Sequence, residues 1–237
     1  MPCSNFTNLF SQEVLAEISV VAGVLDSKGW AEGGGGNISV RLAEFASPSE
    51  SSNSASCPER IRQLDGSSFA FTLSGSRMRE VAVSPAEHLG IVSVENGRLE
   101  EYAPAERRIS SELLTHLYAY AANGCSAIVH AHAEYSSVLS RLFEGRDVPR
   151  MLGRVHTEMP IVLERGVSVV GQHEPGSKQL AGAVGDALSG SDAVLLERHG
   201  LIAGGSDLMQ ALDRFEVAEK CSRMLYIEKL AGLDADS

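Results

Sequence analysis

The chain has 237 residues and a formal net charge of −11, and 43% of its residues are hydrophobic. This length and composition suit one large domain with a full core, while the negative charge excludes nucleic acid and anionic membranes as partners, because both require a basic surface. An anionic substrate must therefore be held by local donors, since the overall field of the protein does not attract it.

The sequence shows neither a membrane span nor the pattern of a secreted disulfide protein. No run of about 18 apolar residues is present, and residues 1–10 lack the basic and apolar regions of a secretory signal. The four cysteines are dispersed, without a C-x-x-C pair (Cys3, Cys57, Cys125 and Cys221). We therefore expect a protein of the reducing cytoplasm without a disulfide framework.

The first part of the chain predicts a helix, a glycine-rich turn and a strand. Residues 11–27 carry apolar side chains at helical spacing, and Ser11 can serve as the N-cap. Glycines occupy positions 33–36, directly before a short strand over residues 37–42. Residues 47–59 are rich in Ser, Pro and Asn, which indicates an exposed loop.

The middle of the chain predicts two strands joined by a tight turn. Residues 91–94 and 98–102 flank Asn96-Gly97, and both turn positions favour the positive φ angles of a two-residue hairpin. A strand over residues 69–73 precedes them and ends at Ser74-Gly75-Ser76. We therefore expect antiparallel neighbours in the sheet.

The second half of the chain predicts further helices and strands. Strands are expected over residues 127–132 and 193–200, and helices over residues 110–122, 136–143 and 207–230. The sequence has no internal repeat. We predict one α/β domain over residues 1–237, with antiparallel content, and not a doubly wound parallel sheet.

His130 and His132 form the sharpest local pattern. On a strand, residues i and i+2 point to the same face, so both imidazoles can bind one ion, whereas on a helix they would diverge by about 200°. His199 lies at the end of another predicted strand and can supply a third nitrogen. Three nitrogens with an open fourth position are typical of catalytic zinc, whereas structural zinc more often has four ligands including thiolates. The remaining histidines have no such partners, and we predict ordinary core or surface positions for them (His88, His116, His156 and His173).

Ser110-Ser111-Glu112 stands at a predicted helix start. A helix N-terminus has unpaired N–H groups and a partial positive charge, so it attracts phosphate or carboxylate groups. A capping box does not account for Glu112, because the N-cap position would then be Ile109. The carboxylate is therefore free for chemistry.

Two glycine-containing loops, residues 33–39 and 74–76, complete the candidate site. Glycines let a backbone approach an oxyanion closely, and Asn37, Ser74 and Ser111 offer neutral donors. A phosphate can thus be bound without a basic patch. Neither loop is a dinucleotide-binding or P-loop motif, so ATP and NAD are not expected.

Taken in order, five motifs resemble the class II aldolase/adducin family: Gly35-Gly36-Asn37-Ile38-Ser39, Thr72-Leu73-Ser74-Gly75, Ser110-Ser111-Glu112, His130-Ala131-His132 and Arg198-His199-Gly200. The resemblance extends from Trp30 to the final predicted helix. Within the family, the chain looks most similar to the rhamnulose-1-phosphate and fuculose-1-phosphate aldolases.

The resemblance implies a three-layer α/β/α domain with a central, largely antiparallel sheet, assembled as a homotetramer. It implies that three histidines bind Zn²⁺, with Mn²⁺ or Co²⁺ as alternatives (His130, His132 and His199). It further implies Glu112 as the catalytic acid/base and Glu158 as a second active-site glutamate. The substrate phosphate would be held by one group of small residues (Gly36, Asn37, Ser39, Ser74, Gly75, Ser110 and Ser111).

The implied reaction is the reversible cleavage of a (deoxy)ketose 1-phosphate to dihydroxyacetone phosphate and an aldehyde such as lactaldehyde. Two other reactions of similar scaffolds stay open, namely methylthioribulose-phosphate dehydration and ribulose-phosphate 4-epimerisation. A non-catalytic, adducin-like scaffold is a further alternative. Such a scaffold would be expected to lose metal ligands, whereas all three histidines and Glu112 are present here.

Overall fold

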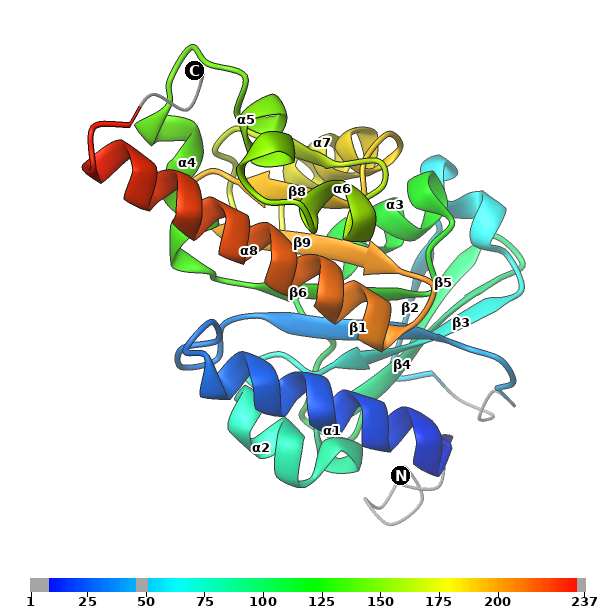
Figure 1. Cartoon of the computed structure of the whole chain (residues 1–237). Helices are drawn as coiled ribbons and strands as arrows, with labels where there is room; N and C mark the ends of the chain where they lie inside the picture. The colour runs from blue at the N-terminus through cyan, green and yellow to red at the C-terminus, as the bar shows by residue number, and fades with distance from the viewer. Residues whose placement is uncertain (1–8, 46–50, 234–237) are drawn as a thin grey trace.

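A single sheet runs through the protein (Figure 1), whose computed structural model describes residues 9–45 and 51–233. Within these residues nine strands lie side by side in the order β2 (Asn53–Ser56), β5 (Arg98–Tyr102), β4 (Leu89–Glu95), β3 (Ser67–Thr72), β1 (Asn37–Leu42), β6 (Ala127–Ala131), β9 (Gly200–Gly205), β8 (Ala193–Leu196) and β7 (Val167–Val170). Neighbouring strands are antiparallel except β7 and β8, which are parallel.

Helices cover both faces of the sheet and form two separate apolar cores. One core is shared by α1 (Gln12–Ser27), α2 (Met78–Val83), α4 (Glu134–Leu142), α5 (Val148–Val155), α6 (Met159–Val162) and α8 (Leu208–Leu230). The other is shared by α3 (Leu113–Asn123), α7 (Lys178–Leu188) and the 3-10 helix η3 (Glu59–Leu64). The expected α/β/α fold with a largely antiparallel central sheet is confirmed.

Side chains that point alternately to the two faces of the central strands explain these two cores. In β6, Ala127 and Val129 face the core beneath α8, whereas Ile128 faces the core beneath α3. Side chains of a strand point alternately to its two faces, so a strand that is apolar throughout can serve both layers. His130 follows the same alternation and therefore lies on the α3 side of the sheet.

The predicted hairpin is present at Asn96-Gly97, which joins β4 to β5 with φ angles of 51° and 72°. The loop predicted over residues 47–59 needs correction. Residues 46–50 lie outside the described part of the chain, but Asn53–Ser56 forms the edge strand β2, paired with β5. All four of its residues are exposed, so no apolar alternation marked the strand in the sequence.

Several short elements were not predicted from the sequence. They include α2, α5 and α6, which span between four and eight residues each. Such segments are too short for a helical period to be read from apolar spacing. The 3-10 turn η4 (Pro85–Glu87), in contrast, lies where the sequence predicts a single helical turn over residues 85–89. None of the described helices combines the length and apolar composition that crossing a membrane requires.

Candidate metal centre and active site

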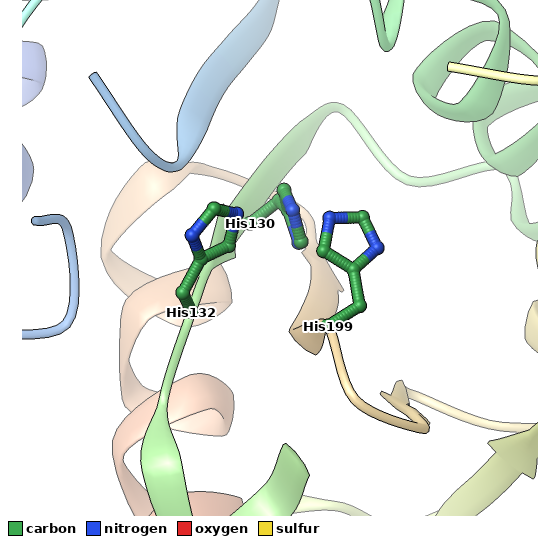
Figure 2. A group of neighbouring side chains, drawn as sticks. All are labelled: His130, His132 and His199. Carbon is green, nitrogen blue, oxygen red and sulfur yellow. The ribbon is translucent and has the colours of Figure 1, made fainter. Parts of the chain in front are cut away.

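Three histidines from two parts of the sheet meet at one end of its central strands. His130 is the fourth residue of β6, His132 follows the end of that strand, and His199 lies in the turn between β8 and β9. Because β6 pairs with β9, this turn is brought beside the end of β6. The ring centroids are 4.8 to 5.5 Å apart, and one nitrogen from each ring lies within 4.8 Å of the others. Figure 2 shows the three rings gathered together.

Hydrogen bonds hold two of the rings through the nitrogen that would not bind an ion. His130 Nδ1 lies 3.0 Å from the carbonyl oxygen of Leu201, so it must donate a proton there. His132 Nδ1 lies 3.2 Å from a carboxylate oxygen of Glu32. Metal-binding imidazoles usually have this kind of partner, because it fixes the tautomer and leaves Nε2 available.

Two glycines permit this close packing. A Cβ atom at Gly35 would lie 2.7 Å from His132 Nδ1, and one at Gly200 would lie 2.2 Å from the carbonyl oxygen of Ala131. Real side chains do not approach so closely, so both positions require glycine if His132 and the turn after His199 are to stay in place.

Glu112 faces the histidines from the start of α3. It occupies the N-cap position and is 6% exposed. Its Oε2 lies 3.0 Å from His130 Nε2, its Oε1 lies 3.4 Å from His199 Nε2, and Asn37 Nδ2 donates to Oε2 over 2.8 Å. The helix therefore starts later than the predicted Ser110 or Ser111, and Glu112 lies against the rings of His130 and His199.

The close contacts in this group shift the pKa values of Glu112, His199 and His130. Burial opposes ionisation of Glu112, but the positive charges of His130 and His199 outweigh it and hold the pKa of Glu112 well below its usual range. Burial and the charge of His130 lower the pKa of His199 to about 4. Burial also disfavours the charged form of His130, but the Glu112 carboxylate raises the pKa of that ring above its usual value.

The donor set fits a metal ion. His130 Nε2 and Glu112 Oε1 are buried, and neither has an aligned hydrogen-bond partner in the part of the chain described. Buried polar atoms are normally satisfied, so an unsatisfied imidazole nitrogen beside an unsatisfied carboxylate oxygen fits a site that binds a cation. Neutral imidazoles and a carboxylate are ligands that zinc and similar divalent ions accept.

A cavity of about 210 Å³ opens beside the histidines. Its wall includes Glu112, His132 and His199 together with six of the seven residues predicted to hold phosphate (Gly36, Asn37, Ser74, Gly75, Ser110 and Ser111). Five segments that are distant in the sequence therefore line one small polar space.

Comparison with known proteins identifies the family. The sequence model described as the class II aldolase and adducin N-terminal domain matches residues 16–226. The chain belongs to the class II aldolase and adducin family. It is 28% identical over 235 residues to the rhamnulose-1-phosphate aldolase of Bacteroides thetaiotaomicron, covering 93% of this chain and 87% of that protein.

Solved structures of the family share the fold. A sugar-phosphate aldolase from Thermotoga maritima superimposes with a TM-score of 0.79 at 31% identity, covering 94% of this chain and 97% of that one. An L-fuculose 1-phosphate aldolase superimposes with a TM-score of 0.69 at 28% identity, covering 94% and 90%. With these aldolases as relatives, this class II aldolase homologue is an enzyme of the lyase class.

Two predicted site residues lie elsewhere in this class II aldolase homologue. Ser39 is fully buried and does not line the cavity, because its hydroxyl is hydrogen bonded to His116 and Tyr120. Glu158 is the N-cap residue of α6, exposed and likewise absent from the cavity wall.

The cavity wall also contains residues that sequence reasoning did not assign. They are Gly34, Gly35, Leu73 and Pro175. The two glycines and Leu73 lie in or directly beside the recognised motifs, so their place in the cavity wall could have been predicted from the sequence. Pro175 belongs to the connection between β7 and α7, and only the folded chain brings that connection over the start of α3, where Gly176 contacts the backbone of Ser111.

Proposed function

We propose that the protein is a metal-dependent aldolase that reversibly cleaves a ketose 1-phosphate, of the rhamnulose or fuculose type, to dihydroxyacetone phosphate and an aldehyde such as lactaldehyde. The observation that carries the proposal is the position of Glu112, which contacts the three-histidine cluster and lines the same cavity as the small polar residues. The names of the aldolase relatives support the substrate class.

His130, His132 and His199 would hold the metal, which we propose to be Zn²⁺, with Mn²⁺ or Co²⁺ as functional replacements. When bound, such an ion acts as a Lewis acid that stabilises negative charge developing on substrate oxygens. The hydrogen bonds to His130 and His132 Nδ1 keep the other ring nitrogens turned toward the ion site.

The phosphate would lie against Ser74, Gly75, Ser110 and Ser111. The hydroxyl groups of Ser74 and Ser111 have no hydrogen-bond partner among the described residues, so both can donate to a phosphate oxygen. Neutral donors suit this protein, because its net charge of −11 gives no general attraction for an anion.

Glu112 would move the proton at the carbon that is cleaved. In the cleavage direction the C4 hydroxyl passes its proton to a water molecule, the C3–C4 bond breaks and the aldehyde leaves. The electron pair remains on the dihydroxyacetone phosphate part as an enediolate. Glu112, protonated from solvent, delivers a proton to C3, so no proton is gained or lost overall. The return reaction begins with removal of that proton by the Glu112 carboxylate.

Glu158 and the homotetramer remain predictions. Glu158 is exposed and lies outside the cavity of its own chain. It can take part in this reaction only if assembly brings it to the cavity of another subunit. Sedimentation of the purified protein, with Glu158→Gln assayed in parallel, tests both predictions together.

A metal analysis combined with a cleavage assay tests the proposed function. We expect about one divalent ion per chain, loss of activity on chelation and recovery with Zn²⁺. Rhamnulose 1-phosphate and fuculose 1-phosphate should each be offered, with dihydroxyacetone phosphate measured by a coupled reduction. A dehydratase releases no triose phosphate, so absence of that product from every ketose 1-phosphate with metal-loaded protein would contradict an aldolase.

A further inference from the structure

Two polar cross-links connect strand β1 to helix α3 below the cavity. In the outer one, Asn37 donates to Glu112 over 2.8 Å. In the inner one, the Ser39 hydroxyl lies 2.7 Å from His116 Nδ1. Asn37 and Ser39 share one face of β1, and Glu112 and His116 are one turn apart at the start of α3, where the His116 N–H donates to the Glu112 carbonyl over 3.3 Å.

The two cross-links are separated by nearly the same distance along the strand as along the helix. Two residues along a strand advance about 6.6 Å, and four residues along a helix advance about 6.0 Å. The pair on β1 therefore faces the pair on α3 with little offset. A helix held at the inner cross-link cannot slide or rotate on the strand without stretching the outer one, which holds the carboxylate.

The inner cross-link lies in a rigid, fully buried environment. Ser39 and His116 are 0% exposed, and Tyr120 OH lies 2.7 Å from the Ser39 hydroxyl. Phe71 packs against the His116 ring and Phe69 stacks on Tyr120 at centroid distances of 5.4 and 4.5 Å. Burial lowers the pKa of His116 to about 3, so the ring stays neutral.

We propose that Ser39 and His116 are positioning residues that set the place of the Glu112 carboxylate, and that Ser39 is not a ligand of the substrate phosphate. The inference rests on the proposed function, because it assigns what this pair does for the proton transfer by Glu112. Ser39 is separated from the cavity and its hydroxyl is already engaged twice, so it has no free group to offer a phosphate. Loss of the inner cross-link loosens α3 and displaces Glu112, whereas Ser74 and Gly75, which lie on a separate segment, keep their places.

The test separates turnover from phosphate binding. Ser39→Ala should lower kcat roughly ten- to a hundredfold, the effect expected of a small displacement of a catalytic group, with KM and the inhibition constant of inorganic phosphate within about twofold of wild type. Ser74→Ala, at the cavity wall, should instead raise KM and the phosphate inhibition constant. Ser222→Ala removes an equally buried hydroxyl that bonds only within α8 and should leave kcat unchanged.

A double-mutant cycle distinguishes positioning from general support. In a Glu112→Gln background, Ser39→Ala should cause almost no further loss of kcat, because its effect passes through the missing carboxylate. His116→Asn, whose amide can replace Nδ1, should retain more turnover than His116→Leu. The comparison of these two His116 variants also tests the proposal if Ser39→Ala does not fold.

Several outcomes overturn the inference. They are an unchanged kcat in Ser39→Ala, a weakening of phosphate binding in place of the loss in kcat, an additive loss in the Glu112→Gln background, and equal turnover in the two His116 variants. A wild-type enzyme that releases no dihydroxyacetone phosphate overturns the proposed function and this inference with it. If the wild-type enzyme is active and Ser39→Ala has the same kcat, this inference alone is overturned.

Discussion

Glu112 is the residue whose environment differs most from that of an ordinary surface glutamate. It is 6% exposed, it is held by Asn37, and two imidazoles lie within 3.4 Å of its oxygens. A buried carboxylate normally has a raised pKa, but here the neighbouring positive charges reverse the shift. A buried carboxylate in a cleft, with its pKa shifted by specific charged partners, is a candidate for a functional group.

Glu112→Gln should preserve the fold and the metal content and lower kcat by about 10²–10⁴-fold, the usual cost of losing a general acid/base. The amide has nearly the same shape but cannot accept the proton from C3. Steady-state cleavage kinetics and metal analysis of both proteins measure the effect. Glu216→Gln on α8 is a matched control that should keep wild-type turnover, and near-normal turnover of Glu112→Gln would exclude the assigned role.

Gly35→Ala should weaken metal binding by roughly ten- to a hundredfold, because the added Cβ would lie 2.7 Å from His132 Nδ1 and displace the ring. Competition with a chromogenic chelator measures the change. Gly153→Ala on α5 is the control: its Cβ would meet no atom within 4 Å, so metal affinity should stay the same. Equal affinities in the two variants would show that His132 does not depend on this glycine.

At the scale of elements, α4 is tied to α8 by a buried carboxylate. Glu219 on α8 is 2% exposed and accepts hydrogen bonds from the backbone N–H groups of Tyr135 and Ser136, each over 2.9 Å. These N–H groups belong to the first turn of α4, which has no side-chain cap of its own. Because α4 begins two residues after His132, this contact holds the segment that follows the metal site.

Glu219 should make the folded state lose stability as pH rises. Burial raises the pKa of Glu219 despite its hydrogen bonds, so the native protein binds this proton more tightly than the unfolded chain. The corresponding stability is fully present below the ordinary glutamate pKa and is lost as pH rises through the higher folded value.

Urea unfolding between pH 4.5 and 7 measures this effect. The free energy of unfolding of wild type should fall more, or rise less, with pH than that of Glu219→Gln, in which the group cannot ionise. Glu216→Gln is again the control and should show the wild-type dependence. Parallel pH curves for wild type and Glu219→Gln would mean that Glu219 titrates alike in the folded and unfolded states.

At the scale of the whole molecule, the sheet assembles the site. The strand order places β6 between β1 and β9, so Asn37, His130 and the turn that carries His199 lie at one end of three adjacent strands. The two strands that flank the His199 turn are far from β6 in the sequence. The site therefore exists only when the central sheet is complete, which couples metal binding to folding.

Metal binding should consequently stabilise the entire fold. At a free metal concentration of one hundred times Kd the gain is about 2.7 kcal/mol, which corresponds to roughly 5–10 °C in Tm for a domain of this size. Differential scanning calorimetry with and without a chelator measures the shift. His199→Ala should unfold at the same temperature in both conditions, and an equal Tm for wild type with and without metal would contradict this coupling.

Features with a local cause can be predicted from the sequence alone. Asn96-Gly97 marks its hairpin because both residues accept positive φ, and the spacing of His130 and His132 places them on one face of a strand. The helix at Ser11 follows from its cap and apolar period. The order of the motifs also carried the family resemblance, and with it the layered fold.

Which side chains come into contact depends instead on the packing of the folded chain. Ser39 and Asn37 point to the same face of β1. Ser39 packs against His116 and is buried beneath α3, whereas Asn37 lies opposite Glu112 at the N-cap of that helix and lines the cavity. The edge strand β2 and the approach of Pro175 to the site likewise depend on partners far away in the chain. Local spacing fixes the direction of a side chain, but its surroundings are set by distant segments whose packing no local pattern records.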